Sequence, residues 1–208
     1  MENKLVAEGV LQVFAKAPIP GRVKTRLIPK LGKLGAANLH KQLVRHCLRK
    51  FSDLFSIQLW CAPDEHHPFF QTCQTDFGVS LHCQPGTDLG ERMTYALASV
   101  IPTPAILIGS DCPSLNVQTI SDAFAALQHD NVVVLAPAED GGYVLIGMQR
   151  IIPELFVDMP WGTDQVLTIT RARLHNLGLR FQQLPTQWDI DRPEDVERWE
   201  AVLKTAKV

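Results

Sequence analysis

Short, continuous apolar runs alternate along this chain with longer segments whose apolar residues recur at helical spacing. The runs are rich in Val, Ile and Leu, and they lie at 10–15, 57–61, 79–83, 104–109, 131–137 and 179–185. Runs of this kind are typical of strands buried on both faces of a parallel sheet. Between them, a repeat such as Leu39, Leu43 and Cys47 predicts an amphipathic helix over about 33–51. The alternation, without internal repeats, predicts a three-layer α/β/α sandwich with a mostly parallel sheet.

Length and composition favour one domain over residues 1–208, with 46% hydrophobic residues to build its core. No apolar run approaches the roughly 20 residues that span a bilayer, and the start, Met1 to Lys4, lacks the layout of a secretion signal. We therefore expect a cytoplasmic protein without a membrane span. The five cysteines include no C-x-x-C pair, which favours buried free thiols. A nucleophilic Cys112 is the less favoured alternative. The oligomeric state is left open.

The charges are segregated: ten of the 20 basic residues, and no acidic residue, lie between Lys16 and Lys50. Many α/β folds bind phosphate at a basic loop directly after the first strand, which favours an anionic small-molecule partner. Few aromatic residues accompany the cations, which disfavours nucleic acid. We rank Lys24 and Arg26 first as phosphate ligands, then Arg22 and Lys16, with an ordinary surface loop as the alternative. The cations interpreted as a solvated helix face are Lys41, Arg45, Arg49 and Lys50.

Two acidic residues follow predicted strands. Asp111 comes after the apolar run at 104–109, at the carboxyl end of a strand, where ligands of α/β sheets bind. A carboxylate there can hold Mg²⁺, although a helix cap explains the residue equally well. Asp140 precedes Gly141 and Gly142, which let backbone approach a ligand, and the alternative is a plain turn.

Further candidates lie near the starts of helices. Asp191, with Glu194 three residues later, has the spacing of a helix cap. Asp189 has no such local role, so we rank it above Asp191 as a metal ligand and retain both. Arg92 is not needed for capping, and an anionic substrate group is a hypothesis for it. Trp161 forms a pocket wall or packs against the core. The candidate substrate-binding residues are Arg92, Gly141, Gly142, Tyr143 and Trp161.

Taken together, these motifs resemble the nucleotide-diphospho-sugar transferase superfamily, which has the GT-A fold. The similarity is greatest to a bacterial family of proposed glycosyltransferases, some of which are linked to arsenosugar biosynthesis. It also extends to phospholactate and molybdenum-cofactor guanylyltransferases. The segments that carry the resemblance span nearly the whole chain: Phe14–Pro18, Gly21–Leu27, Asp88–Arg92, Gly109–Pro113, Asp140–Tyr143 and Asp189–Asp195.

The resemblance implies a transferase that requires Mg²⁺ or Mn²⁺. Lys24 and Arg26 correspond to a phosphate-binding loop, Asp111 to a metal ligand, and Asp189 or Asp191 to a later one. The segment at Asp111 lacks the D-x-D of many glycosyltransferases. Glycosyl transfer from a nucleotide sugar to a small-molecule acceptor is the leading interpretation. In it Lys24, Asp111 and Asp140 are catalytic, with Asp140 as general base or sugar ligand. The alternative is nucleotidyl transfer from an NTP to a phosphorylated small molecule, with release of pyrophosphate.

Overall fold

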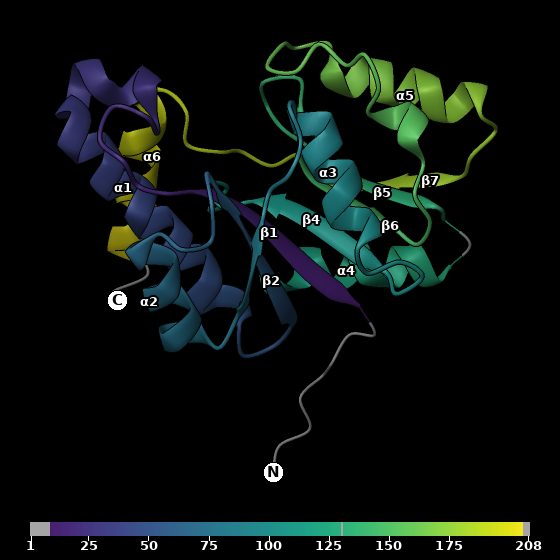
Figure 1. Ribbon diagram of the computed structural model, residues 1–208. Helices are drawn as coiled ribbons and strands as arrows, with labels where there is room; N and C mark the ends of the chain where they lie inside the picture. Colours follow the sequence, from purple (N-terminus) through teal and green to yellow (C-terminus); the bar gives the residue numbers. More distant parts are fainter. Residues whose placement is uncertain (1–8, 130, 206–208) are drawn as a thin grey trace.

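The protein is described by a computed structural model that covers residues 9–129 and 131–205; Met1 to Lys4, used above to argue against a secretion signal, lie outside the described residues. Its centre is a seven-stranded sheet with the order β3-β2-β1-β4-β6-β5-β7, in which β6 alone runs antiparallel to its neighbours. The predicted mostly parallel α/β fold is therefore confirmed (Figure 1). The strands are β1 Val10–Lys16, β2 Ser56–Ala62, β3 Ser80–Cys83, β4 Ala105–Gly109, β5 Val133–Pro137, β6 Tyr143–Met148 and β7 Phe181–Gln183.

Helices cover both faces of this sheet. Their bounds are α1 Ile28–Phe51, α2 Pro68–Phe77, α3 Leu89–Ala98, α4 Val117–Gln128, α5 Val166–Asn176 and α6 Pro193–Thr205. Buried side chains of α1, α2 and α4 form one core with the sheet, and those of α3 and α5 form a second core on the other face. Helix α6 instead packs on α1, where Trp199 and Val196 meet Leu39 and Leu43. Within the described ranges, we find no helix with the length and apolar content to cross a membrane.

The strand order places a topological switch point between β1 and β4. From β1 the chain adds β2 and then β3 on one side, and it returns through α3 to place β4 on the other side of β1. At such a point the loops leaving the two strands diverge, and the crevice between them is where open α/β sheets bind ligands. The predicted basic loop follows β1 and Asp111 follows β4, so both leave the sheet at this crevice.

Strand β6 fits closely between β4 and β5. A Cβ atom at Gly147 would lie 2.7 Å from a side-chain carbon of Val134 and 3.2 Å from the carbonyl oxygen of Ala105. Because Gly147 has no side chain, β6 can lie close to Val134 of β5 and to the backbone of Ala105 in β4. The β5–β6 turn carries Asp140, so this fit also positions part of the candidate site.

We expect Gly147→Ala to lower the free energy of unfolding by about 1–3 kcal/mol, because the added methyl group overpacks a filled interior. Urea denaturation followed by circular dichroism measures the change. Gln74→Ala on the exposed face of α2 is the control and should alter stability by less than about 0.5 kcal/mol. Wild-type stability in Gly147→Ala would contradict the close fit of β6.

Candidate functional site

The loop after β1 is held by buried apolar residues, and all of its cations except Lys24 remain at the surface. Val23 and Leu27 are buried, and Gly21 takes the left-handed conformation with φ 82°. Lys24 is also left-handed, with φ 47° and ψ 45°, a conformation that is uncommon for residues other than glycine and is often found at functional sites. Local geometry thus turns Lys24 inward, whereas Lys16, Arg22 and Arg26 stay exposed.

Lys24 forms an ion pair with Asp111 that joins this loop to the one after β4. The Lys24 Nζ lies 2.7 Å from the Asp111 Oδ2, and the exposed fractions of the two side chains are 7% and 34%. Burial alone would lower the pKa of Lys24 and raise that of Asp111. Burial is the largest single influence on each pKa, but the opposite charge, the hydrogen bond between the two groups and smaller contributions from nearby groups together outweigh it. The pKa of Lys24 is therefore raised and that of Asp111 is lowered. Both groups are therefore charged at neutral pH.

Asp111 does not cap a helix. Helix α4 begins six residues later at Val117, and its N-cap is Asn116, whose side chain accepts a hydrogen bond from the Thr119 N–H at 2.9 Å. The helix-cap alternative for Asp111 is therefore wrong. In α3, by contrast, the Asp88 side chain accepts from the Glu91 N–H at 2.8 Å, so Asp88 caps that helix.

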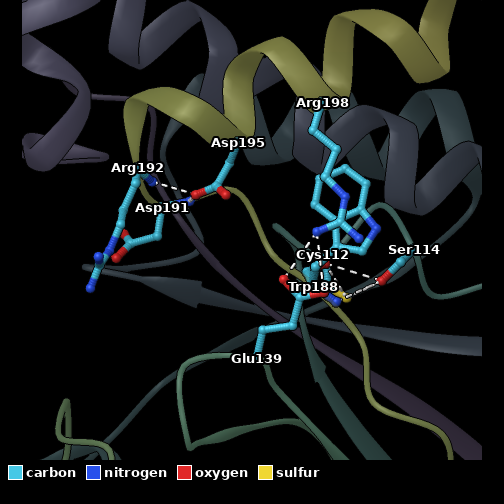
Figure 2. A network of polar contacts seen from close by, with 8 residues as sticks. All are labelled: Cys112, Ser114, Glu139, Trp188, Asp191, Arg192, Asp195 and Arg198. Carbon is cyan, nitrogen blue, oxygen red and sulfur yellow. Dashed lines mark hydrogen bonds and ion pairs between the residues drawn. The ribbon is translucent and has the colours of Figure 1, made fainter.

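The segment between β7 and α6 is bound to the loop that carries Asp111. The Ile190 N–H donates to the Asp111 carbonyl at 3.0 Å. Figure 2 shows how Trp188 is held: its N–H donates to the Ser114 Oγ, and its carbonyl accepts from the Ser114 hydroxyl and the Cys112 thiol at 3.1 Å each. Asp189 and Asp191 are thereby brought beside Asp111, although nearly 80 residues separate them in sequence.

Helix α6 ties the same segment to the turn between β5 and β6. The Arg198 guanidinium lies 4.1 Å above the ring of Trp188 and forms an ion pair with the Glu139 carboxylate at 3.0 Å. Glu139 is the residue before Asp140. Stacking of Arg on Trp and a charge-assisted hydrogen bond both restrict motion, so three loops share one set of contacts (Figure 2).

The expected capping role of Asp191 with Glu194 is wrong. The Asp195 carboxylate accepts from the backbone N–H groups of Asp191 and Arg192, at 2.9 and 2.6 Å, and so satisfies the start of α6 (Figure 2). The Asp191 carboxylate instead forms an ion pair with Arg26. Because α6 begins at Pro193, it is the Asp195 carboxylate, and not that of Glu194, that reaches these N–H groups from the first turn.

Two cavities adjoin at Asp111. The larger, the basic pocket, has a volume of about 660 Å³, and the smaller, the second cavity, about 260 Å³. Both are lined by Phe14, Leu89, Gly109 and Asp111. The predicted phosphate and substrate ligands in the basic pocket are Lys16, Arg22, Lys24, Arg26 and Arg92, and the candidate metal ligand Asp191 also lines it. The second cavity is lined by Asp140, Gly142, Tyr143, Trp161 and Asp189. Gly141 lines neither, but its carbonyl accepts from the Leu167 N–H at 3.0 Å.

Asp189 differs in its surroundings from the other carboxylates. Burial, followed by the negative charges of Asp111, Asp140 and Asp191, raises the pKa of Asp189 to about 6, and Lys24 offsets only part of this rise. No hydrogen bond or ion pair engages its carboxylate in the described ranges. Crowded carboxylates of this kind favour the approach of a cation.

A divalent cation is the cofactor that the sequence resemblance implies. Residues 9–129 and 131–205 contain no cluster of three or more His, Cys, Asp or Glu arranged to hold a metal. Mg²⁺, however, usually takes one or two carboxylates, with waters and substrate phosphates completing its shell. Asp111 and Asp189 have the chemistry for such a partial site, provided that Lys24 releases Asp111. Asp191 is engaged by Arg26 and faces the basic pocket.

Sequence reasoning missed His40, which is 6% exposed and lines the basic pocket. It lies in the buried stripe of α1, and its Nε2 donates to the carbonyl of Lys16 at 2.8 Å. The proton is therefore on Nε2, and Nδ1 is a buried acceptor without a partner among the described residues. His40 lies four residues before Val44, on the buried face of α1, and a histidine on a buried helix face is the sequence feature that could have identified it.

Two interpretations of surface residues need correction. Lys50 is not a solvated cation: its ammonium donates to the carbonyls of Pro113 and Leu115, at 2.9 and 2.8 Å, and so holds the loop after Asp111. Arg45 forms an ion pair with Asp76. The cysteines are free as predicted, but Cys83 is exposed. Burial raises the pKa of Cys112 to about 11, which keeps its thiol protonated at neutral pH and disfavours the nucleophile interpretation.

A protein-family model matches residues 44–163, more than half of the sequence, and its description is "Uncharacterized protein conserved in bacteria (DUF2064)". The chain belongs to this family. The region matched by the DUF2064 model includes Arg92, Asp111, Asp140 and Trp161, but not the basic loop after β1 or Asp189. None of the curated proteins compared with the DUF2064 chain matches it.

Among solved structures, a protein from Desulfovibrio desulfuricans G20 with the provisional name nucleotide-diphospho-sugar transferase is 29% identical, with a TM-score of 0.80. The match covers 89% of the DUF2064 chain and 83% of that protein. CMP:2-keto-3-deoxy-manno-octonic acid synthetase, solved with CTP, is 12% identical with a TM-score of 0.61, over 96% and 99% of the two chains. A nucleotidyl transferase from Methanothermobacter is 12% identical with a TM-score of 0.57, over 95% and 99%. The latter two share the fold.

We expect Lys24 and Asp111 to be energetically coupled. Asp111→Asn leaves the nearly buried ammonium without its carboxylate and should lower the free energy of unfolding by about 1–3 kcal/mol. Lys24→Met should cost less, because Asp111 retains contact with water. The double variant should be more stable than the sum of the single losses predicts. Urea denaturation of all four proteins gives the coupling energy.

The pair Arg45–Asp76 supplies a matched control, because both of its side chains are partly exposed, at 28% and 38%. A double-mutant cycle of this pair, with Arg45→Met and Asp76→Asn, should give a coupling energy of only about 0.2–1 kcal/mol. Additive losses at Lys24 and Asp111 would show that their contact does not hold the two loops together.

Proposed function

We propose that this protein is a transferase that holds a nucleotide sugar by its diphosphate in the basic pocket and passes the glycosyl group to a small molecule in the second cavity. One observation carries the proposal: the Lys24–Asp111 pair lies where the two cavities meet, at the switch point of the sheet. Arg and Lys are suited to phosphate oxygens, and five of them line the larger cavity. The transferase character of proteins with this fold supports the same interpretation.

In this proposal an acceptor hydroxyl oxygen attacks the anomeric carbon of the sugar. The new carbon–oxygen bond forms as the bond to the diphosphate breaks, and its electron pair leaves with the nucleoside diphosphate. The Asp140 carboxylate, which lines the second cavity, takes the hydroxyl proton. Lys24 and Arg26 offset the charge that develops on the departing diphosphate, which is the largest requirement of such a step.

The cation that we expect, Mg²⁺ or Mn²⁺, would be held by Asp111 and Asp189 and would supply further positive charge at the diphosphate. Lys24 has two roles in this scheme. Without nucleotide its ammonium neutralises Asp111, and with nucleotide it turns to a phosphate oxygen. The exchange would keep the Lys24 ammonium paired in both states, because a phosphate oxygen would replace the Asp111 carboxylate once that carboxylate held a cation.

A second candidate is nucleotidyl transfer from an NTP to a phosphorylated acceptor, with release of pyrophosphate. The five cations of the basic pocket are compatible with it, because they suit the charge of a triphosphate as well as that of a diphosphate. Two of the compared structures are a CMP-sugar synthetase and a nucleotidyl transferase. The two candidates share the phosphate and metal ligands and differ in the bond that breaks.

We expect nucleotide binding to depend on a divalent cation through Asp111 and Asp189. Titration calorimetry with UDP and GDP in Mn²⁺ should show binding that EDTA abolishes and that Asp111→Asn or Asp189→Asn weakens at least about tenfold, since each removes an anionic metal ligand. Asp189→Asn should melt at or above the wild-type temperature at neutral pH, because it removes a charge that its neighbours repel.

Asp191→Asn is the matched control for this measurement. It removes the exposed ion pair with Arg26, whose side chain is 63% exposed, and it should leave metal-dependent affinity within about threefold of wild type. Equal affinities with Mn²⁺ and with EDTA would contradict the metal proposal. A loss in Asp191→Asn as large as that in Asp189→Asn would move the second ligand to Asp191.

The released product distinguishes the two transfers. Incubation with Mn²⁺, nucleotide sugars and a mixture of hydroxyl-bearing small molecules should release nucleoside diphosphate, measured by anion-exchange chromatography. Incubation with NTPs and sugar phosphates should release no pyrophosphate above the level of Lys24→Met. Pyrophosphate release by the wild-type protein, lost in Lys24→Met, would favour nucleotidyl transfer.

A further inference from the structure

The second cavity differs from the basic pocket in the sign of its charge. Its charged lining residues are Asp111, Asp140 and Asp189, and no Lys, Arg or His lines it among the described residues. In the neighbouring basic pocket, cations outnumber carboxylates. The boundary between the two charge regimes is Asp111, which lines both cavities.

The rest of the second cavity is mainly apolar. Met93 and Leu107 contribute aliphatic surface, and Phe14, Tyr143 and Trp161 contribute aromatic rings. The rings of Tyr143 and Trp161 meet edge to face with their centroids 6.5 Å apart. Apolar walls with a few polar groups are typical of sites for small organic molecules.

Close backbone contacts hold these walls in place. A Cβ atom at Gly90 would lie 2.7 Å from the Phe156 carbonyl and 3.2 Å from Trp161 Nε1, so the absence of a side chain lets the Trp161 loop rest directly on α3. A Cβ atom at Gly141 would lie 2.4 Å from the Asp164 carbonyl. The turn that bears Asp140 and the loop that bears Trp161 therefore pack backbone to backbone, and the cavity is preformed.

We propose that the acceptor group that enters the second cavity is uncharged or cationic and carries an apolar ring or chain, and that phosphorylated acceptors are excluded. The role of this molecule as an acceptor rests on the proposed function. Its chemistry is inferred from the lining of the cavity alone. An anion placed among three carboxylates is repelled, most strongly where walls exclude water. A cation held by Asp111 and Asp189 would offset the charge of these two carboxylates and would leave Asp140 as the charge on the acceptor side.

The distinction also separates the two transfers. Glycosyl transfer requires only a nucleophile such as a hydroxyl or an amine, whereas nucleotidyl transfer to a phosphorylated acceptor requires a second anion next to the first. The cations that would hold a second anion are absent from the described lining of this cavity. Its chemistry therefore favours glycosyl transfer to an acceptor without phosphate.

Three probes with the same aromatic body and different charge test this proposal: benzyl alcohol, benzylamine and benzyl phosphate. The chain has four tryptophans, and Trp161 lines the second cavity but not the basic pocket. Its indole N–H signal in a ¹H–¹⁵N spectrum, assigned by its loss in Trp161→Phe, therefore reports on this cavity. Titration of the full chain with the alcohol or the amine should shift this signal. The phosphate should bind with an affinity at least about tenfold lower than that of the alcohol.

The double variant Asp140→Asn/Asp189→Asn provides the control for charge. It should bind benzyl phosphate more tightly and benzylamine more weakly than wild type, and it should bind benzyl alcohol equally well. Benzyl phosphate binding as tight as that of the alcohol, a Trp161 signal unmoved by all three probes, or a variant with wild-type preferences would each overturn the proposal. The titrations contain no nucleotide, so such a failure is distinct from a failure of nucleotide binding.

Discussion

The ion pair between Lys24 and Asp111 is the contact on which the arrangement of the site depends. It closes the switch point of the sheet by joining the loop after β1 to the loop after β4. A lysine ammonium with 7% exposure is costly to bury unless an opposite charge compensates it. The same aspartate accepts the Ile190 N–H through its backbone carbonyl. One residue therefore fixes a cation on one side and the Asp189–Asp191 segment on the other.

The contacts around Trp188 hold the Asp189–Asp191 segment in this arrangement. Ser114 and Cys112 bind its backbone, and Arg198 lies over its ring while reaching Glu139 on the β5–β6 turn. The Cys112 thiol thus makes a structural contact next to the site. These contacts join segments that emerge from the sheet at different strands, so the cavities between them keep a defined shape.

Division of charge is the functional consequence that we draw from this geometry. Cations of the β1 loop and α3 face the basic pocket, whereas Asp140 and Asp189 face the second cavity, and Asp111 lies between them. An anionic donor on one side and an acceptor without negative charge on the other would each meet a complementary surface. Glycosyl transfer from a nucleotide sugar, the reaction that we propose, would use both surfaces.

Local patterns in the sequence determined the elements of the fold. Apolar runs and helical stripes depend on neighbours a few residues apart, so strands such as β1 and β4 and the helices between them were predictable. Capping, as by Asp88, involves residues only a few positions apart, so it depends on local sequence. Asp189 could be inferred as a candidate ligand because no such local role accounts for it. The limit of local reasoning shows at Asp191 and Glu194: the helix begins one residue later than their spacing suggested, and Asp195 caps it instead.

Tertiary structure alone decided which of these residues meet. The antiparallel placement of β6, the pairing of Lys24 with Asp111, the role of Lys50 at the loop after Asp111, and the buried His40 all depend on contacts between residues far apart in sequence. The sequence by itself determined the α/β class and the basic and acidic residues available for a site. It did not determine that they divide into two cavities of opposite charge, because that division results from how the sheet orders its strands and brings their loops together.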